Sequence, residues 1–144
     1  MTSQLNVDTI VDKAGSGGTN VKVANTSTYV SDGGAVTQNT VQGLAKVWFN
    51  IDQEPSTQTF RDSFNVASSS DEGTGVTKLT FTNAFNNDGY SAAGMAKDDS
   101  GGSFGILRIS SPMSTTQFQF MGESHDDTNV DCDVAAGSLH GDLA

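Results

Sequence analysis

The sequence predicts an all-β protein, in which a short N-terminal β-hairpin or extended arm precedes an antiparallel β-sandwich-like module. Three observations lead to this class. Ser, Thr, Asn and Gly supply most of the polar content, and these residues favour strands and turns over helices. Short segments that mix apolar and polar residues recur along the chain, with turn-rich spacers between them. No heptad pattern and no 3.6-residue stripe is visible anywhere.

The first expected element is a β-hairpin over Leu5–Val23. Apolar and polar residues alternate from Leu5 with a period close to two, and the run Ala14–Gly18 then supplies a turn. Thr19–Val23 completes the hairpin as a returning strand.

A polar connector is expected over Ala24–Gln42, where the pattern is weak and Asp32–Gly34 forms an evident turn. Long structureless loops are uncommon inside compact domains. The boundary is therefore expected at residues 40–43, with an arm and connector over 1–42 and the β-sandwich-like module over 43–144.

The module is expected to consist of short strands separated by clusters of Gly, Asn, Asp and Ser. One such cluster is the run SSSDEGTG at residues 68–75, which is read as a turn. Strands spaced this regularly are typical of a sandwich or a meander. The expected strands are Ala45–Ile51, Thr57–Val66, Val76–Thr82, Tyr90–Lys97, Phe104–Ser110, Thr116–Ser124 and Asp133–Leu139.

Alternation within these segments identifies the expected core. Phe118 and Phe120, for example, are two residues apart and share one face of their strand. Trp48 is out of phase with the core residues beside it, so we expect it to pack on a second surface such as a subunit interface. The expected core residues are Val47, Phe49, Ile51, Phe64, Val66, Leu79, Phe81, Ile106, Phe118 and Phe120.

Composition limits the partners. The 144 residues include 7 basic and 17 acidic side chains, for a net charge of −10. Nucleic acids and anionic membranes are bound by clustered Lys and Arg, so neither is expected as a partner. Only 35% of the residues are hydrophobic, which suggests that an oligomer adds to the burial that one chain can achieve.

The N-terminal residues lack the basic and apolar regions of a secretion signal, so we expect the protein to be made in a cytosol. Cys132 is the single cysteine, which excludes an intrachain disulfide.

No metal or cofactor is expected. His125 and His140 are isolated, without a second ligand at zinc spacing. The acidic segment Asp126–Asp133 offers oxygen atoms that could bind calcium, but it lacks the central Gly and the terminal Glu of an EF-hand. A solvated acidic loop is the favoured reading, and calcium binding stays open.

No enzymatic activity is expected either. No Ser lies in a G-x-S-x-G elbow, and the acidic neighbours of Cys132 would hold its thiol protonated. Glu54 and Glu72 are carboxylates of the kind that glycosidases use, but spacing alone does not pair them.

Carbohydrate binding remains a second reading. Tyr29, Tyr90 or Trp48, if exposed beside Asn and Asp, could stack on a sugar ring. The alternative is that these aromatic side chains are packed inside the protein.

Two parts of the chain resemble a known kind of protein. SQLNVDTIVDKAGSGGTNVKV (Ser3–Val23) resembles a segment recurrent in fibre-like structural proteins of marine bacteriophages, notably those infecting cyanobacteria and abundant ocean heterotrophs. Further along, GLAKVWFNID, FRDSFNVASSSDEGTG and LTFTNAF resemble, in this order, the β-rich terminal module of such tail-fibre-like proteins. The resemblance spans about the first 85 residues. It rests on short sequence segments that occur in the same order, not on catalytic motifs.

This resemblance implies a homotrimeric, β-rich fibre or decoration protein on the virion surface, on tail or capsid, assembled in the host cytoplasm. We further expect the N-terminal arm to attach the protein to other virion proteins. The alternative function is a receptor-binding adhesin module that recognises host surface glycans. The residues expected at interfaces are Leu5, Val7, Ile10, Val21, Val23 and Trp48.

Overall fold

A computed structural model of the chain describes residues 28–30, 37–40, 43–55, 57–97, 104–111 and 113–142. All regular secondary structure in this part of the chain is β-strand, as the sequence predicts. In these residues no helix is long and apolar enough to cross a membrane. The chain divides into two units, Met1–Val41 and Gln42–Ala144, and the boundary expected after residue 42 lies beside this division.

The first unit contains a two-stranded antiparallel sheet, formed by β1 (Thr28–Val30) and β2 (Thr37–Asn39). These strands lie in the segment expected to be a connector. Each is only three residues long, too short for alternation to reveal it. The hairpin expected over Leu5–Val23 lies outside the described residues, as do the expected interface residues Leu5, Val7, Ile10, Val21 and Val23.

The second unit contains an eight-stranded antiparallel sheet in the order β4-β3-β10-β7-β8-β9-β6-β5. Strands β7, β8 and β9 follow one another, and β10 returns to pair with β7, which is the order of a Greek key. The strands are β3 (Ala45–Asp52), β4 (Thr59–Phe64), β5 (Val66–Gly73), β6 (Val76–Phe81), β7 (Ser91–Lys97), β8 (Phe104–Ser110), β9 (Gln117–Glu123) and β10 (Val134–His140).

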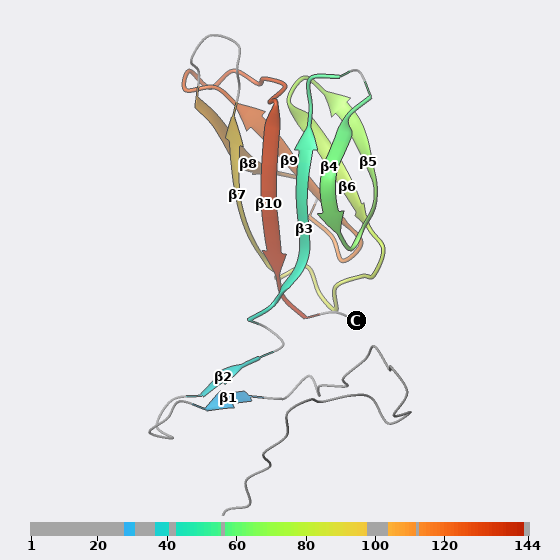
Figure 1. Cartoon of the computed structure of the whole chain (residues 1–144), viewed down its shortest axis with the longest axis vertical. Coiled ribbons are helices and arrows are strands. Elements are labelled where there is room, and N and C mark those ends of the chain that lie inside the picture. Colours follow the sequence, from blue (N-terminus) through green and yellow to red (C-terminus); the bar gives the residue numbers. More distant parts are fainter. Residues whose placement is uncertain are drawn as a thin grey trace, which may run out of the picture. The chain divides into compact units, whose positions relative to one another are not determined.

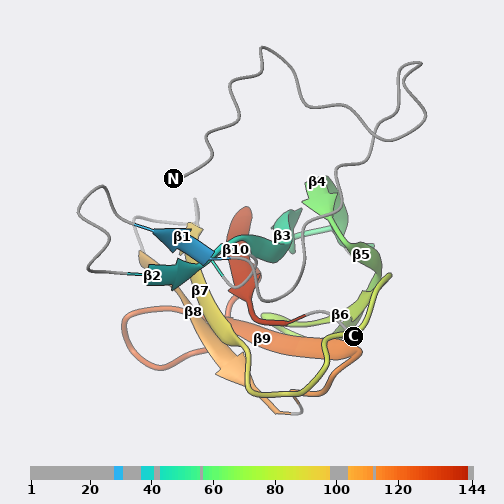
Figure 2. The ribbon, with the colours of Figure 1, turned by 90° about the horizontal axis from the view of Figure 1, so that it is seen from below.

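The sheet folds over on itself into two layers, which confirms the predicted sandwich-like arrangement. Strands β4, β3, β10 and β7 form one layer, and β8, β9, β6 and β5 form the other (Figures 1 and 2). The Phe49 ring on β3 stacks on the Phe120 ring on β9, with 4.9 Å between their centroids. Along one side β4 continues into β5 through Asn65, whose φ is 59°. Asn is one of the few residues that adopt this left-handed backbone readily.

One predicted strand and one predicted turn are wrong. The segment Thr57–Val66 was expected to be a single strand ending before a turn at residues 68–75. Instead the chain bends at Asn65, and β5 runs from Val66 to Gly73. Because β5 pairs only with β6, most of its Ser, Asp and Glu side chains point into solvent. Such an edge strand has a turn-like composition although its backbone is extended.

Most of the predicted core is correct. Val66 is half-buried and packs against the core, and the side chain of Ile106 lies outside the described part of the structure. Core placement is confirmed for Val47, Phe49, Ile51, Leu79, Phe81, Phe118 and Phe120, each at most 6% exposed.

Phe64 was expected in the core, but 52% of it is exposed. Ile51 pairs with Phe60, which packs against the core, and Trp48 pairs with Phe64. A register shift between Asn50 and Ile51 separates these two pairs. Such a bulge reverses the in–out alternation along β4, so Phe60 faces inward and Phe64 faces outward.

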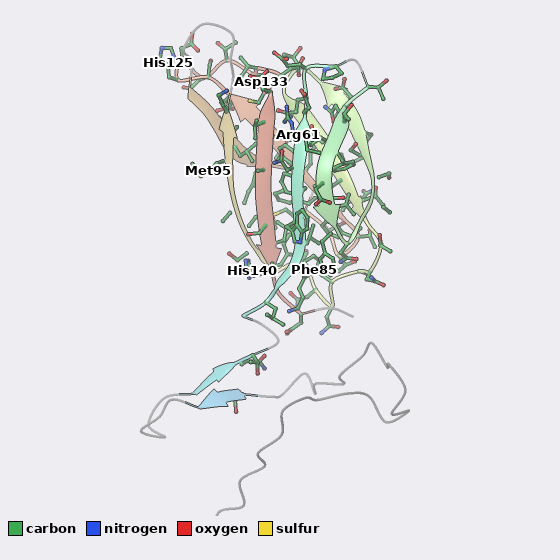
Figure 3. All side chains as sticks on the ribbon, in the orientation of Figure 1. Arg61, Phe85, Met95, His125, Asp133 and His140 are labelled. Atoms are coloured by element: carbon green, nitrogen blue, oxygen red, sulfur yellow. The ribbon has the colours of Figure 1, made fainter. Side chains whose placement is uncertain are left out.

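An aromatic cluster closes one end of the sandwich. The rings of Phe85 and Tyr90 stack with 4.4 Å between centroids, and Phe81 meets Phe85 edge-on at 5.3 Å. The Phe85 amide donates to the Thr115 carbonyl at 2.8 Å, which holds the segment between β6 and β7 across this end. Figure 3 labels Phe85 at this end of the strands. Phe85 lies outside all the strands expected from the sequence, so the alternation did not include it in the expected core.

Tyr90 provides a prediction about pH. Its hydroxyl donates to the Gln117 carbonyl at 3.0 Å, and burial raises its pKa from 10.0 to about 12. Below pH 10 the phenol is neutral in both the folded and the unfolded chain. Between pH 10 and about 12 only the unfolded phenol ionises, so the free energy of unfolding falls across this window.

Tyr90→Phe removes this ionisation and the hydroxyl's hydrogen bond. At pH 8 we expect the variant to be about 1 kcal/mol less stable than the wild type. From pH 10 to 12 the difference shrinks, because only the wild type loses the contribution of Tyr90. Denaturant unfolding of both proteins at each pH measures the two free energies of unfolding. The lysines also lose their charge in this pH range, but they do so in both proteins and cancel in the comparison. Parallel pH profiles would contradict the prediction.

Candidate functional site

The acidic segment expected as a possible calcium loop connects β9 to β10. The Ser124 hydroxyl donates to Asp126, which lowers the pKa of the Asp126 carboxyl. Asp131 Oδ1 accepts from the Gly75 amide at 2.6 Å and so holds the loop against the turn between β5 and β6. Among the residues that the structure describes, no group of three or more His, Cys, Asp or Glu side chains is placed to hold a metal ion.

Arg61 on β4 connects the end of this loop to the neighbouring strand β3. Its guanidinium donates to the Asp133 carbonyl and forms an ion pair with Asp52, with 3.0 Å between Nη2 and Oδ2. Figure 3 shows Arg61 and Asp133 near the same end of the strands. The side chains of Arg61 and Asp52 are 42% and 25% exposed, so solvent screens the pair and its contribution to stability is small.

A buried polar network closes the end of the sandwich opposite the aromatic cluster. Gln53 is 1% exposed, and its Nε2 donates to the Gly75 carbonyl and to Thr77 Oγ1, both at 2.9 Å. Its Oε1 accepts from the Cys132 amide at 3.2 Å, and its own amide donates to the Cys132 carbonyl at 3.0 Å. One residue thus joins three separate segments of the chain.

Close packing surrounds this network. A Cβ added to Gly122 would lie 2.7 Å from Cys132 Sγ and 2.8 Å from the Val130 carbonyl oxygen. Gly75 has a φ of +72° and would bring a Cβ to 2.6 Å from the Gly122 carbonyl oxygen. Cys132 itself is fully buried, so its thiol does not face a substrate.

Glu54 and Glu72, the two carboxylates that the sequence pattern could not pair, lie on different elements. Glu72 on β5 accepts from Lys78 and from Ser70, and the Lys78 contact contributes most to lowering its pKa. Glu54 follows β3 in the loop to β4. A lowered pKa favours the carboxylate form, which does not suit Glu72 to the role of a general acid.

The histidines are also separate from each other. His125 is exposed in the loop after β9, whereas His140 lies on β10 (Figure 3). The His140 Nε2 atom is 3.4 Å from the hydroxyl of Ser138, two residues earlier on the same strand. No carboxylate hydrogen-bonded to His140 is found in the described residues, whereas nucleophilic serine chemistry usually has one to orient the base.

Of the three aromatic residues proposed for sugar stacking, Tyr90 is packed in the core at 6% exposure. Tyr29 lies on β1. Trp48 is 37% exposed and, as the sequence predicts, points away from the core, because its neighbours Val47 and Phe49 point into it. Trp48 is therefore accessible to a ligand or partner, whereas Tyr90 is not.

Trp48 belongs to a row of side chains on the outer face of its layer. Its register partners are Phe64 on β4 and Ser138 on β10, and Ser138 pairs in turn with Ala93 on β7. Opposed residues in antiparallel strands share a face. The adjacent row consists of Asp62, Asn50, Ala136 and Met95, of which Met95 is 79% exposed. We call this surface the Trp48 face: Trp48, Phe64, Ala93, Met95, Ala136 and Ser138.

The Trp48 face differs from the outer face of the second layer, where Lys78, Gln117 and Gln119 lie on adjacent strands.

In comparisons with known proteins, no family model, no curated protein and no solved structure matches this chain. The Trp48 face is the candidate functional surface among the described residues.

Proposed function

We propose that the protein is a non-enzymatic structural protein of a bacteriophage virion, a homotrimeric surface fibre or decoration protein on the tail or capsid. The observation that carries this proposal is the ordered resemblance to marine phage fibre-like proteins. Its second part, Gly43–Phe85, corresponds to β3, β4, β5 and β6. The segments that carry the resemblance thus include both edge strands of the sheet, β4 and β5, and the strand β3 that carries Trp48.

The proposed trimer is supported by the Trp48 face. Phe64, Trp48 and Met95 are 52%, 37% and 79% exposed on one outer face of a chain that has only 35% hydrophobic residues. Large exposed apolar side chains on one face are a feature of sites of interaction between proteins. Association would add apolar burial, worth about 25 cal/mol per Å².

The test of the trimer is the molar mass of the purified full-length protein by light scattering. A mass three times that of the 15.0 kDa chain is expected. A stable monomer across the accessible concentration range would contradict the trimer.

The arm over residues 1–42 is proposed to attach the protein to other virion proteins during assembly in the host cytoplasm. Deleting Met1–Val23 is expected to abolish incorporation into particles. The second unit should stay folded, because every core residue in the described part of the chain lies within Gln42–Ala144. Circular dichroism of the variant provides the folding control. Unchanged incorporation would rule out the anchoring role.

A receptor-binding adhesin for host surface glycans is the second candidate. It is favoured by the half-exposed Trp48 and Phe64, because the next row across the same strands holds Asn50 and Asp62. Aromatic rings beside amide and carboxylate groups can stack on a sugar and bond its hydroxyls. A glycan array with wild type and Trp48→Ala tests this candidate: binding that the substitution abolishes supports it, and no binding by the wild type opposes it.

A further inference from the structure

Four consecutive exposed residues, 86–89, lie in the connection between β6 and β7. A buried aromatic side chain stands on either side of them, Phe85 at 1% and Tyr90 at 6% exposure, and the two rings stack on each other. The ends of this loop are thus held together in the core while its residues face solvent. The loop contains Asp88 followed by Gly89, and Asp88 is the one aspartate in the described part of the chain that a glycine follows.

Few bonds restrain this pair of residues. Among the described residues, none forms a backbone–backbone hydrogen bond with Asp88 or Gly89, and none is hydrogen-bonded to the Asp88 carboxyl. The Gly89 amide donates to Asn87 Oδ1 at 2.9 Å, and Asn87 is itself exposed. Glycine has no Cβ to obstruct the approach to its nitrogen. The Gly89 nitrogen is therefore open to attack on the neighbouring Asp88 carboxyl.

Asp62, which is followed by Ser63, has the opposite surroundings. Both residues lie on β4 and pair with Asn50 and Phe49 on β3, so the sheet holds their backbone extended. The Ser63 amide donates to Asp62 Oδ1 at 2.8 Å, and Ser63 carries a side chain beside its nitrogen. Asp62 is therefore an internal reference for a restrained aspartate.

We propose that Asp88 is a modification site, at which the link to Gly89 converts to isoaspartate through a cyclic imide. The Gly89 nitrogen bonds to Cγ of Asp88 and loses its proton, and a carboxyl oxygen leaves as water. A water molecule then opens the ring at the former main-chain carbonyl of Asp88. The chain now runs through Cβ and Cγ, and a carboxylate remains on Cα. One water is lost and one is gained, so the mass is unchanged and no oxidant or reductant takes part.

Isoaspartate lengthens the main chain of the loop by one methylene group. The loop is fixed at both ends, because the Phe85 amide donates to the Thr115 carbonyl and the Asn86 amide to the Asp142 carbonyl, both at 2.8 Å. The ring of Tyr90 lies 4.4 Å from that of Phe85. Closely packed interiors do not absorb extra length without displacing side chains. We expect the modification to loosen the aromatic cluster. It is independent of the proposed virion role.

The test incubates the full-length protein at neutral pH, below its unfolding temperature, in water enriched in a heavy oxygen isotope. Trypsin cleavage after Lys78 and Lys97 then releases residues 79–97, in which Asp88 is the one aspartate. Liquid chromatography separates the isoaspartate form of this peptide, and mass spectrometry detects the heavy oxygen that it has gained. Deamidation of asparagine in the same peptide is distinguished because it changes the mass in ordinary water as well. The chain's other Asp–Gly pair, Asp32 and Gly33, falls in a different peptide.

We expect isoaspartate at residue 88 to form within about tenfold of its rate in a synthetic peptide of residues 84–92, because exposed loops open at little cost in free energy. It should form at least about tenfold faster than at Asp62, where the sheet must open first. If Asp88 stays unmodified in the folded protein while the free peptide reacts, the fold protects this site and the proposal is overturned.

Gly89→Ala is the matched control. A Cβ at Gly89 would meet only Asn87 Oδ1, at 3.0 Å, and the φ of Gly89 lies outside the left-handed region, so the fold should be retained. The added methyl group obstructs the attacking nitrogen, and we expect the reaction to slow by at least about tenfold. Equal rates in the wild type and Gly89→Ala would contradict the cyclic-imide route.

Thermal melts of aged samples test the consequence for the aromatic cluster. Aged wild type should contain a fraction that unfolds at lower temperature and grows in proportion to the isoaspartate content. Aged Gly89→Ala should contain no such fraction. If protein with isoaspartate at residue 88 unfolds at the same temperature as fresh protein, the loop accommodates the extra methylene group and the expected loosening is wrong.

Discussion

Phe120→Ala should lower the free energy of unfolding of the second unit by about 3–5 kcal/mol, the usual cost of truncating a buried aromatic side chain. Phe120 is 1% exposed, and its ring lies between layers, stacked on Phe49 with 4.9 Å between centroids. Removing it leaves a cavity lined by rings that cannot easily close it. For a unit of this size the midpoint of thermal unfolding should fall by on the order of 20 °C.

Phe64→Ala is the matched control for this substitution. It removes the same atoms from another strand of the unit, at a residue that is 52% exposed. The expected loss is within about 1 kcal/mol. Denaturant unfolding at two protein concentrations distinguishes any contribution of association at the Trp48 face. Equal losses for the two variants would mean that Phe64 is a core residue, as simple alternation along β4 suggests.

Gln53→Ala should lower the free energy of unfolding by roughly 2–4 kcal/mol, a large loss for the substitution of a polar residue. It removes the two hydrogen bonds that Nε2 donates, to Gly75 and Thr77, and leaves the Cys132 amide without its acceptor. The site is closely packed, as the surroundings of Gly122 show, so truncation also creates a cavity. The free energy of unfolding from denaturant titration measures the loss.

Gln119→Ala is the control for Gln53→Ala. Gln119 is half-buried on β9 and donates a side-chain hydrogen bond to Ser110 Oγ at 3.1 Å. Its loss should cost within about 1 kcal/mol. Reaction of Cys132 with a thiol reagent gives a second readout: it should accelerate in Gln53→Ala and stay slow in Gln119→Ala. Similar behaviour of the two variants would contradict a central role for Gln53.

The central strands could be predicted because residues that face the core alternate with residues that face away from it along their sequences. Along β6 and β9, half-buried side chains alternate with fully buried ones, and Leu79, Phe81, Phe118 and Phe120 occupy the buried places. A strand between two neighbours with one face on the core must alternate in this way. The pattern therefore identified these strands and the direction of their side chains, and for the same reason it placed Trp48 outside the core.

The edge strands and the ends of the sandwich could not be predicted in this way. β5 has a turn-like composition because solvent covers much of it, and a bulge beside Arg61 reverses the phase that leads to Phe64. Phe85, Gln53 and Cys132 are buried by contacts with segments far along the chain. Those contacts depend on how the strands are ordered in the sheet, which local pattern does not report.

For the candidate site, the sequence alone determined that Trp48 points away from the core, because the alternation of Val47 and Phe49 on β3 requires it. Only the tertiary structure decided what lies beside it. Strand order brings Phe64, Ser138 and Ala93 into one row with Trp48, although β3 and β10 are separated by most of the second unit's sequence. Local alternation sets the direction of each side chain, whereas the choice of neighbouring strands is made by long-range burial. The Trp48 face therefore depends on which strands become neighbours in the sheet, and local alternation could not predict it.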